Sequence, residues 1–222
     1  MDSSQFNLWP EQASAQAMEV DALFILLIGI TVFFTVAIMA VLAVLAYKYR
    51  RRGDDDVTAD IHGSMVLEIT WTLIPLVIVM GTFVWGAKIF FEQYRIPENT
   101  MDIRVVGKQW MWKVQHPNGK REINHIYLPK GEAIKLTMTS EDVIHSVFIP
   151  AFRVKKDAVP GRFTTTWFRP TKLGEYHLFC TEYCGTEHSL MVGSVTVVEP
   201  EEYAAWLQKG AGVAVTAASD TP

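Results

Sequence analysis

The chain has 222 residues, of which 50% are hydrophobic and only 20% charged, and its mean hydropathy of +0.15 exceeds what a water-soluble domain of this size usually needs. Its 20 basic residues face 24 acidic ones and form no block longer than the run at 50–52, which excludes nucleic acid as the main partner. Two cysteines exclude a scaffold held by several disulfides.

Two apolar runs in the first hundred residues predict membrane-spanning helices. Residues 22–46 carry no charge over 25 positions, and a helix of that length, roughly 37 Å, crosses a hydrocarbon core of about 30 Å. Residues 69–87 add 19 uncharged positions, with Pro75 near the start, where a membrane helix tolerates a kink. The alternative for either run is a buried core helix, but neither shows a polar face.

The basic residues near these runs predict their orientation. Residues 1–21 contain no Lys or Arg, whereas Lys48 and the arginines at 50–52 follow the first run directly. We therefore expect residues 22–91 to form a hairpin with a cytoplasmic connector, and residues 1–21 to face outward. The start of the chain lacks the basic residues of a signal peptide, so the first helix is its own export signal or the chain is already processed.

The composition after residue 91 changes to that of a globular all-β domain. Ile134, Leu136 and Met138 alternate with polar residues, and further β-branched and aromatic runs are separated by Pro and Gly turns. Many short strands without long helices between them predict a β-sandwich or barrel over residues 92–209, on the outer face. A short helix is expected at 200–209, and the small-residue tail at 210–222 is expected to be disordered.

A soft donor set occurs in the segment CTEYCGTEHSLM. Cys180 and Cys184 are four residues apart, His188 and Met191 follow, and His145 stands 35 residues upstream at the start of an apolar run. Thiolate, imidazole and thioether donors together favour copper, because Met is a poor ligand for zinc and no carboxylate cluster suits calcium or magnesium.

Several interpretations of this segment remain open from the residues alone. A disulfide is possible on the oxidising side of a membrane, but it requires no His or Met at fixed offsets. A zinc site lacks a fourth suitable ligand. A mononuclear blue-copper site needs only one Cys, so the second thiolate suggests two coppers that share both sulfurs, with one His on each. Met191 would then be a weak ligand to one ion and a loop carbonyl a ligand to the other.

These residues closely resemble subunit II of the haem-copper cytochrome c oxidases. The resemblance rests on His145, CTEYCGTEHSLM, DAVPGR, GKQWMW and the helix hairpin, and it covers roughly residues 20–200. It implies a membrane-anchored all-β protein, in which a two-helix transmembrane hairpin precedes a cupredoxin-like β-barrel or sandwich with a binuclear copper centre, CuA. The implied ligands are His145, Cys180, Cys184, His188, Met191 and the backbone carbonyl of Glu182, and the Glu182 side chain would also reach a magnesium ion bordering subunit I.

The resemblance implies two further functional residues. Trp110 matches the tryptophan that receives electrons from cytochrome c, and it is expected near the copper and exposed, although Met111 replaces the tyrosine that commonly follows. Trp112 could equally be a residue that packs into the barrel. Glu68 matches, through EITWTLIP, a glutamate at the cytoplasmic start of a proton path in subunit I; its alternative is a position at the lipid interface. No CxxCH occurs, so no covalent haem is expected.

The function that follows is electron uptake for a terminal respiratory oxidase of a bacterial inner membrane, rather than a mitochondrial one. Electrons would come from cytochrome c and pass to haem in subunit I, where oxygen is reduced to water with proton translocation. The alternatives are a nitric oxide reductase with the same copper module and a membrane-anchored copper-binding or copper-delivery protein. Because residues 92–222 carry 15 basic and 15 acidic side chains, we expect a neutral, acidic or tethered cytochrome to dock on an apolar patch around Trp110.

Overall fold

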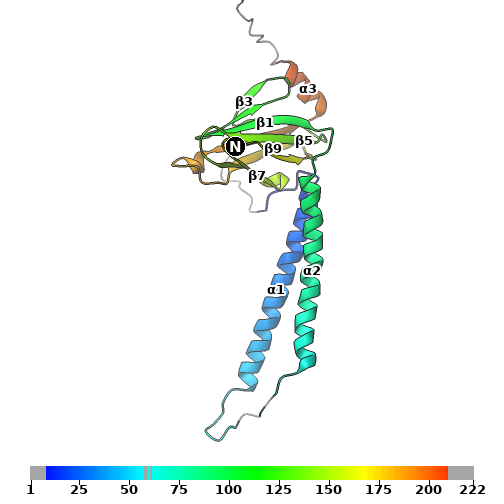
Figure 1. The fold of residues 1–222 in the computed structure, drawn as a ribbon, viewed down its shortest axis with the longest axis vertical. Coiled ribbons are helices and arrows are strands. Elements are labelled where there is room, and N and C mark those ends of the chain that lie inside the picture. The colour runs from blue at the N-terminus through cyan, green and yellow to red at the C-terminus, as the bar shows by residue number, and fades with distance from the viewer. Residues whose placement is uncertain (1–8, 58–59, 61, 210–222) are drawn as a thin grey trace, which may run out of the picture. The chain divides into compact units, whose positions relative to one another are not determined.

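The computed structural model describes residues 9–57, 60 and 62–209 (Figure 1). Contacts within the chain divide it into two units: Glu19–Phe90, which holds most of two long helices, and Met1–Met18 with Phe91–Pro222, which holds the strands. The tail at 210–222, predicted to be disordered, lies outside the described residues, as do residues 1–8.

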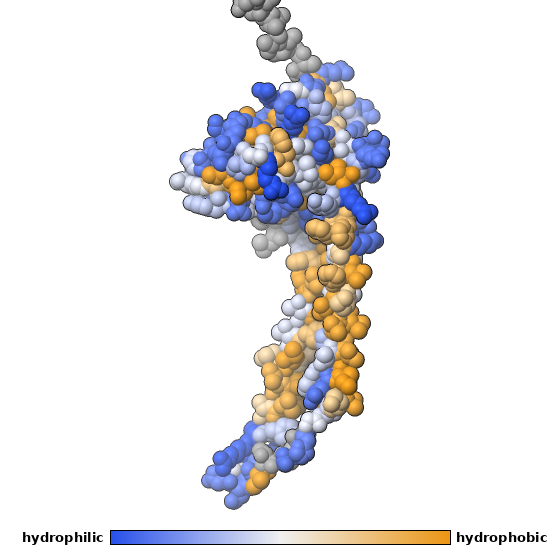
Figure 2. All heavy atoms as spheres, in the orientation of Figure 1, coloured by the Kyte–Doolittle hydropathy of each residue, from blue (hydrophilic) through white to orange (hydrophobic). Residues whose placement is uncertain are grey.

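The two apolar runs form the helices α1 (Ala17–Lys48) and α2 (Met65–Tyr94). Both helices extend beyond the predicted spans, because the polar residues at their ends also favour helix. These end residues only have to reach the membrane surface. Their apolar side chains are exposed all round, as Phe33 at 65% and Val77 at 69% illustrate, and Figure 2 shows hydrophobic residues along both helices. Helices of this length and composition can cross a membrane, and the membrane would then cover their apolar side chains.

The β unit is a sandwich of two five-stranded sheets, with strand orders β3-β2-β1-β5-β8 and β4-β10-β9-β6-β7. The pairs β1/β5 and β4/β10 are parallel, and the remaining pairs are antiparallel. The strands are β1 (Met101–Lys108), β2 (Met111–Gln115), β3 (Arg121–Ile123), β4 (His125–Pro129), β5 (Ile134–Ser140), β6 (His145–Ile149), β7 (Val154–Ala158), β8 (Thr164–Phe168), β9 (Gly174–Cys180) and β10 (Val192–Val198).

The core lies between the sheets and follows the predicted alternation. Ile134, Leu136 and Met138 of β5 are fully buried, while the polar residues between them are half-buried on the outer side. Trp112 and Phe168 are also fully buried and fill the space between the two layers. The predicted all-β sandwich after two membrane helices is therefore confirmed.

The short helix α3 (Pro200–Gln208) packs on β4 and on the turn between β2 and β3. The Trp206 ring stacks on Tyr127 at 4.7 Å between centroids, and Lys120 Nζ lies 3.5 Å from its centre. His116 is buried against the same ring, and burial, followed by the nearby charges of Lys120 and His125, lowers its pKa to about 4. His116 is therefore a neutral packing residue at physiological pH.

The segment before α1 belongs to the β unit. Ala13 N–H donates to the carbonyl of Ala151, and Thr171 N–H donates to the carbonyl of Ala13. Ser14 Oγ donates to the Phe152 carbonyl at 2.8 Å, and Ala13 and Ser14 are buried. The sequence pattern gave no indication of this pairing, which makes the residues preceding the first helix an additional edge segment of the sandwich.

Candidate metal centre

The candidate donors lie where two neighbouring strands of one sheet meet a loop. β6 begins at His145, β9 ends at Cys180, and the two strands pair antiparallel with Val147 opposite Cys180. The loop that follows β9 carries Cys184 and then the short 3-10 helix η3 (His188–Leu190), before Met191 leads into β10. The sheet thus fixes His145 and Cys180, and the loop supplies the remaining donors.

The distances between donor atoms are short. Cys180 Sγ lies 3.8 Å from Cys184 Sγ and 3.9 Å from His145 Nδ1. Cys184 Sγ lies 3.4 Å from His188 Nδ1 and 3.8 Å from Met191 Sδ. The carbonyl oxygen of Glu182 is 3.3 Å from Cys180 Sγ. The other four predicted ligands therefore each lie within 3.9 Å of one of the two cysteine sulfurs.

This geometry fits a bound soft metal. Both cysteines are free and buried, and His145, Cys180 and Cys184 form a group whose donor atoms lie within 4.8 Å of one another. Metal–sulfur bonds of about 2.3 Å let one ion contact two sulfurs that are 3.8 Å apart. Burial, and then the adjacent Cys180 thiol, raises the pKa of Cys184 to about 12, so a metal must displace its proton on binding.

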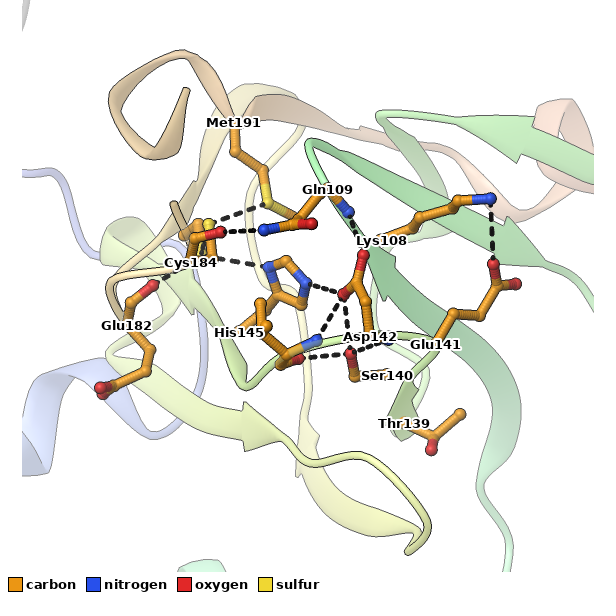
Figure 3. A network of polar contacts seen from close by, with 12 residues as sticks. Lys108, Gln109, Thr139, Ser140, Glu141, Asp142, His145, Glu182, Cys184 and Met191 are labelled. Carbon is orange, nitrogen blue, oxygen red and sulfur yellow. Dashed lines mark hydrogen bonds and ion pairs between the residues drawn. The ribbon is translucent and has the colours of Figure 1, made fainter. Parts of the chain in front are cut away.

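Asp142 orients the His145 ring. Its Oδ1 lies 2.8 Å from His145 Nε2, and Gln109 N–H donates to Oδ2 at 2.8 Å (Figure 3). Burial acts to raise the pKa of Asp142, but hydrogen bonds from Gln109, His145 and Val143 lower it to about 2. An ionised carboxylate holds the proton on Nε2, which leaves Nδ1 free to bind a metal on the side of the sulfurs.

The turn between β1 and β2 packs directly on the loop after β9, residues 181–191, which we call the metal loop. Gln109 Nε2 donates to the carbonyl of Cys184 at 2.8 Å. A Cβ at Gly185, whose φ is +119°, would lie 2.9 Å from Gln109 Nε2 and 3.2 Å from the Trp110 ring. Trp110 is therefore half-buried against the loop, which corrects the expectation of an exposed ring; its neighbour Trp112 is fully buried, edge-on to His145.

Glu182 and Glu68 lie in different surroundings. The Glu182 carbonyl faces the sulfurs, whereas its carboxylate is exposed and points away from them (Figure 3). Glu68 lies in the helix unit, exposed in the first turn of α2. An acid in the first turn is favoured by the helix dipole, which accounts for its position without requiring a role in proton transfer.

Sequence reasoning missed three supporting residues: Gly107, Gln109 and Asp142. An acid three residues before a ligand His is a local signal that could have indicated Asp142. Gly107 lies against the His145 ring of the other sheet, and Gln109 bonds Asp142 and Cys184, so both depend on contacts between segments far apart in sequence, which no local pattern reveals.

We expect Gly107→Ala to disrupt the His145 position. A Cβ at Gly107 would lie 2.7 Å from Cδ2 of the buried His145 ring and 3.0 Å from its Cγ, so the ring, and Nδ1 with it, must shift. Copper affinity should fall by about 10- to 100-fold, the usual effect of losing support for a metal ligand. Copper titration of the apo-chain measures this, and Gly29→Ala, whose Cβ meets nothing within 4 Å, is the control. Unchanged affinity would show that the ring tolerates the added methyl group.

The fold and the donor set together define a membrane-anchored protein with a cupredoxin-like β-sandwich and a soft-metal centre. Residues 2–87 match the profile described as "Cytochrome C oxidase subunit II, transmembrane domain", and residues 119–198 match "Cytochrome C oxidase subunit II, periplasmic domain". The chain therefore belongs to the cytochrome c oxidase subunit II family, which implies a copper centre.

Individual relatives agree with this assignment. Cytochrome c oxidase subunit 2 of Alkalihalophilus pseudofirmus is 32% identical over 83% of this chain and 56% of that protein. A probable subunit 2 of Rickettsia bellii is 31% identical over 83% of this chain and 76% of that protein. The crystal structure of the periplasmic domain of subunit II (CoxB) from Bradyrhizobium japonicum is 34% identical, with a TM-score of 0.50, over 52% of this chain and 96% of that one.

Proposed function

We propose that the chain is the electron-accepting subunit of a terminal oxidase. It would take electrons from cytochrome c and pass them to haem in subunit I, for reduction of oxygen to water. The observation that carries the proposal is the convergence of two buried thiols, two imidazoles, a thioether and a carbonyl on one point of the β unit. Family membership supports it, although the chain spans only about half the length of the Alkalihalophilus relative.

We propose that the donor set holds two copper ions rather than one. The two cysteine sulfurs would be shared, and His145 and His188 lie beside different sulfurs, at Cys180 and Cys184 respectively. Met191 Sδ and the Glu182 carbonyl likewise lie beside different sulfurs. Such a centre supplies one-electron transfer with little rearrangement. The protein contributes by burying the sulfurs, fixing the His145 tautomer through Asp142 and keeping the loop rigid through Gln109.

Trp110 is the proposed point of electron transfer into the centre. Its ring lies against Gly185, next to Cys184, and the residues around the loop include several exposed apolar side chains. Tyr183 is 76% exposed, Leu190 73% and Ile144 45%. This apolar surface would contact the donor cytochrome, and the ring behind it would connect that contact to the metal loop.

The exposed Glu182 carboxylate is proposed to bind magnesium together with groups of subunit I. Its own backbone carbonyl is directed at Cys180, so one residue would link the two metal sites. A hard, exposed carboxylate suits magnesium, which commonly retains several waters and takes only one or two protein carboxylates.

The proposed orientation places the β unit on the outer face of a bacterial inner membrane. Lys48 and the arginines at 50–52 lie in or next to the connector between α1 and α2, which predicts a cytoplasmic connector. Two spans return the chain to the side on which it started. The hydrogen bonds from Ala13 and Ser14 to the sandwich require that same arrangement, so residues 9–18 and 92–209 would share the outer side.

We expect Glu68→Gln to slow oxygen reduction in the assembled oxidase if Glu68 begins a proton path. A neutral amide cannot gain and lose a proton, and loss of one relay group typically reduces a rate by about 10²- to 10⁴-fold. Copper reduction by cytochrome, measured in the same preparation, should not change. Glu98→Gln in the β unit is the control, and unchanged turnover would show that Glu68 acts only at the lipid interface.

The experiment that tests the proposed centre is copper analysis with electron paramagnetic resonance on the full chain in detergent. Two coppers per chain and one unpaired electron shared between two nuclei are expected. One copper per chain, with hyperfine structure from a single nucleus, would contradict the proposal.

A further inference from the structure

The sheet that carries Trp110 also bears a groove on its outer face, separate from the metal loop. The groove has a volume of about 570 Å³ and lies over β1, β2, β3 and β5, with Phe163 at one side. In the view of Figure 2, the β unit shows strongly hydrophilic residues beside a few apolar ones. No part of the proposed metal centre lines this groove.

Two arginines line this groove from the two strands on either side of β2. Arg104 of β1 and Arg121 of β3 are both opposite Gln115 of β2, so they flank one residue at a backbone separation of about 10 Å, two strand spacings. Side chains as long as arginine can converge on one carboxylate from that distance.

Neither arginine is paired with an acid of the described part of the chain. Over the residues that the structure describes, neither Arg104 nor Arg121 has a carboxylate within ion-pair distance. By contrast, Lys113 at the same groove is paired with Glu141 at 2.7 Å, and Lys135 further along the sheet is paired with Asp102 at 3.4 Å. Glu122 is the other acid of the lining. The three cations of the groove thus outnumber its two acids, and one of those acids is already occupied.

The groove also exposes apolar side chains to water, which is unfavourable unless a partner covers them. Phe163 is 72% exposed and Ile123 is 56% exposed. Exposed aromatic residues next to arginines are typical of protein interfaces, where both residue types dominate binding. A small anion would neutralise the arginines but leave these side chains in water, so a protein surface is the better complement.

The groove lies within reach of a partner centred on Trp110. Lys113, which lines it, is three residues beyond Trp110 on an extended strand, or about 10 Å. An interface that buries about 800 Å² of each partner extends about 16 Å from its centre. A donor seated on the apolar surface around Trp110 would therefore also cover Lys113 and come alongside Arg104 and Arg121.

We propose that the Arg104–Arg121 groove receives an acidic patch of the electron-donor protein, and so steers an acidic cytochrome to Trp110. The proposal rests on the proposed function of the chain as electron acceptor. The equal numbers of basic and acidic residues after Phe91 describe the domain as a whole, whereas the sheet gathers an excess of positive charge in this groove. Charges at the rim of an interface act mainly on the association rate.

The test uses two forms of one probe: a basic cytochrome c, and the same protein after succinylation of its lysines, which makes it acidic. Copper reduction in the full chain is followed by stopped flow at about 10 mM ionic strength, where charges act over about 30 Å. Arg104→Gln/Arg121→Gln should slow reduction by the succinylated form by about three- to tenfold, within the range of electrostatic steering. With the basic form, the double variant should be unchanged or faster.

The matched control is Lys155→Gln/Lys156→Gln, which removes the same charge from β7 of the other sheet. An equal loss in this control would show that net charge acts rather than the groove. An equal rate of wild type and groove variant with the succinylated form would overturn the proposal. So would phosphate binding at the arginines that leaves reduction by the succinylated form unchanged, which indicates a small-anion site. Loss of haem-bearing subunits from the purified complex of the groove variant would also overturn it, because it indicates a subunit interface.

A small uncharged reductant separates this proposal from the proposed function. If that reductant fails to reduce bound copper, or if no copper binds, the proposed function itself is wrong. If it reduces copper equally in all variants while the succinylated cytochrome shows no dependence on Arg104 and Arg121, only the steering groove is wrong.

Discussion

Replacing Cys184 by serine should remove the shared-electron signal expected of the proposed two-copper centre and lower the copper content to one ion per chain or less. Cys184 Sγ lies within 3.8 Å of three other donors: Cys180, His188 and Met191. A serine hydroxyl is a hard donor that binds copper poorly, so the second ion loses its bridge. Copper analysis and electron paramagnetic resonance on the same sample measure both effects.

The β-fold should survive this substitution. Cys184 belongs to the loop after β9, outside both sheets, and a buried hydroxyl in place of the thiol costs about 1–3 kcal/mol. Circular dichroism of the apo-protein should therefore remain that of a β-sandwich. The exposed neighbour Thr186 provides the control, Thr186→Ala. Global unfolding of Cys184→Ser without copper would indicate that the loop serves chiefly to stabilise the domain.

Replacing Trp110 by glutamine should slow electron transfer from cytochrome much more than it weakens binding. The proposed contact with the donor would be spread over side chains such as Tyr183, Leu190 and Ile144, which are exposed. The proposed path to the metal loop passes through one ring, which lies against Gly185. We expect a rate loss of about a hundredfold, comparable to misplacing a reacting group by about 1 Å. The Michaelis constant for cytochrome should change by less than about fivefold, the effect of losing a residue worth no more than about 1 kcal/mol.

Stopped-flow reduction at increasing cytochrome concentration separates the two effects. Leu190→Gln, on the same surface but outside the path, should show the opposite pattern, with weaker binding and a nearly unchanged maximal rate. If Trp110→Gln changes only the Michaelis constant, the ring serves docking and the electrons take another route. The buried Trp112, whose ring is edge-on to His145 at 5.8 Å, would then be the next residue to test.

The architecture was predictable because its signals are local. Long uncharged runs identify membrane helices without reference to the rest of the chain, and alternation in β5 identifies a strand buried on one side. The spacing of Cys180, Cys184, His188 and Met191 within one loop likewise placed four donors together. His145 lies 35 residues upstream of this loop, and it was added to the set from its place at the start of an apolar run and from the resemblance to subunit II.

The support of the site was not predictable, because it depends on strand register. Gly107 must lack a side chain only because β1 lies beside the His145 ring, and Gln109 reaches Cys184 across 75 positions of sequence. The expectation of an exposed Trp110 failed for the same reason, since the metal loop covers part of its ring. Arg104 and Arg121 are unremarkable in the sequence until the register places both beside Gln115.

The pairing of residues 9–18 with the sandwich has a consequence for biosynthesis. Ala13 is synthesised early, but its hydrogen-bond partners Ala151 and Thr171 are made well over a hundred residues later. In the proposed orientation, the segment therefore waits, with its backbone polar groups in water, until both helices are inserted and most of the strands have been exported to its side. Its capture is a late step with a long closing loop, so failed export of either end would leave the sandwich without this edge.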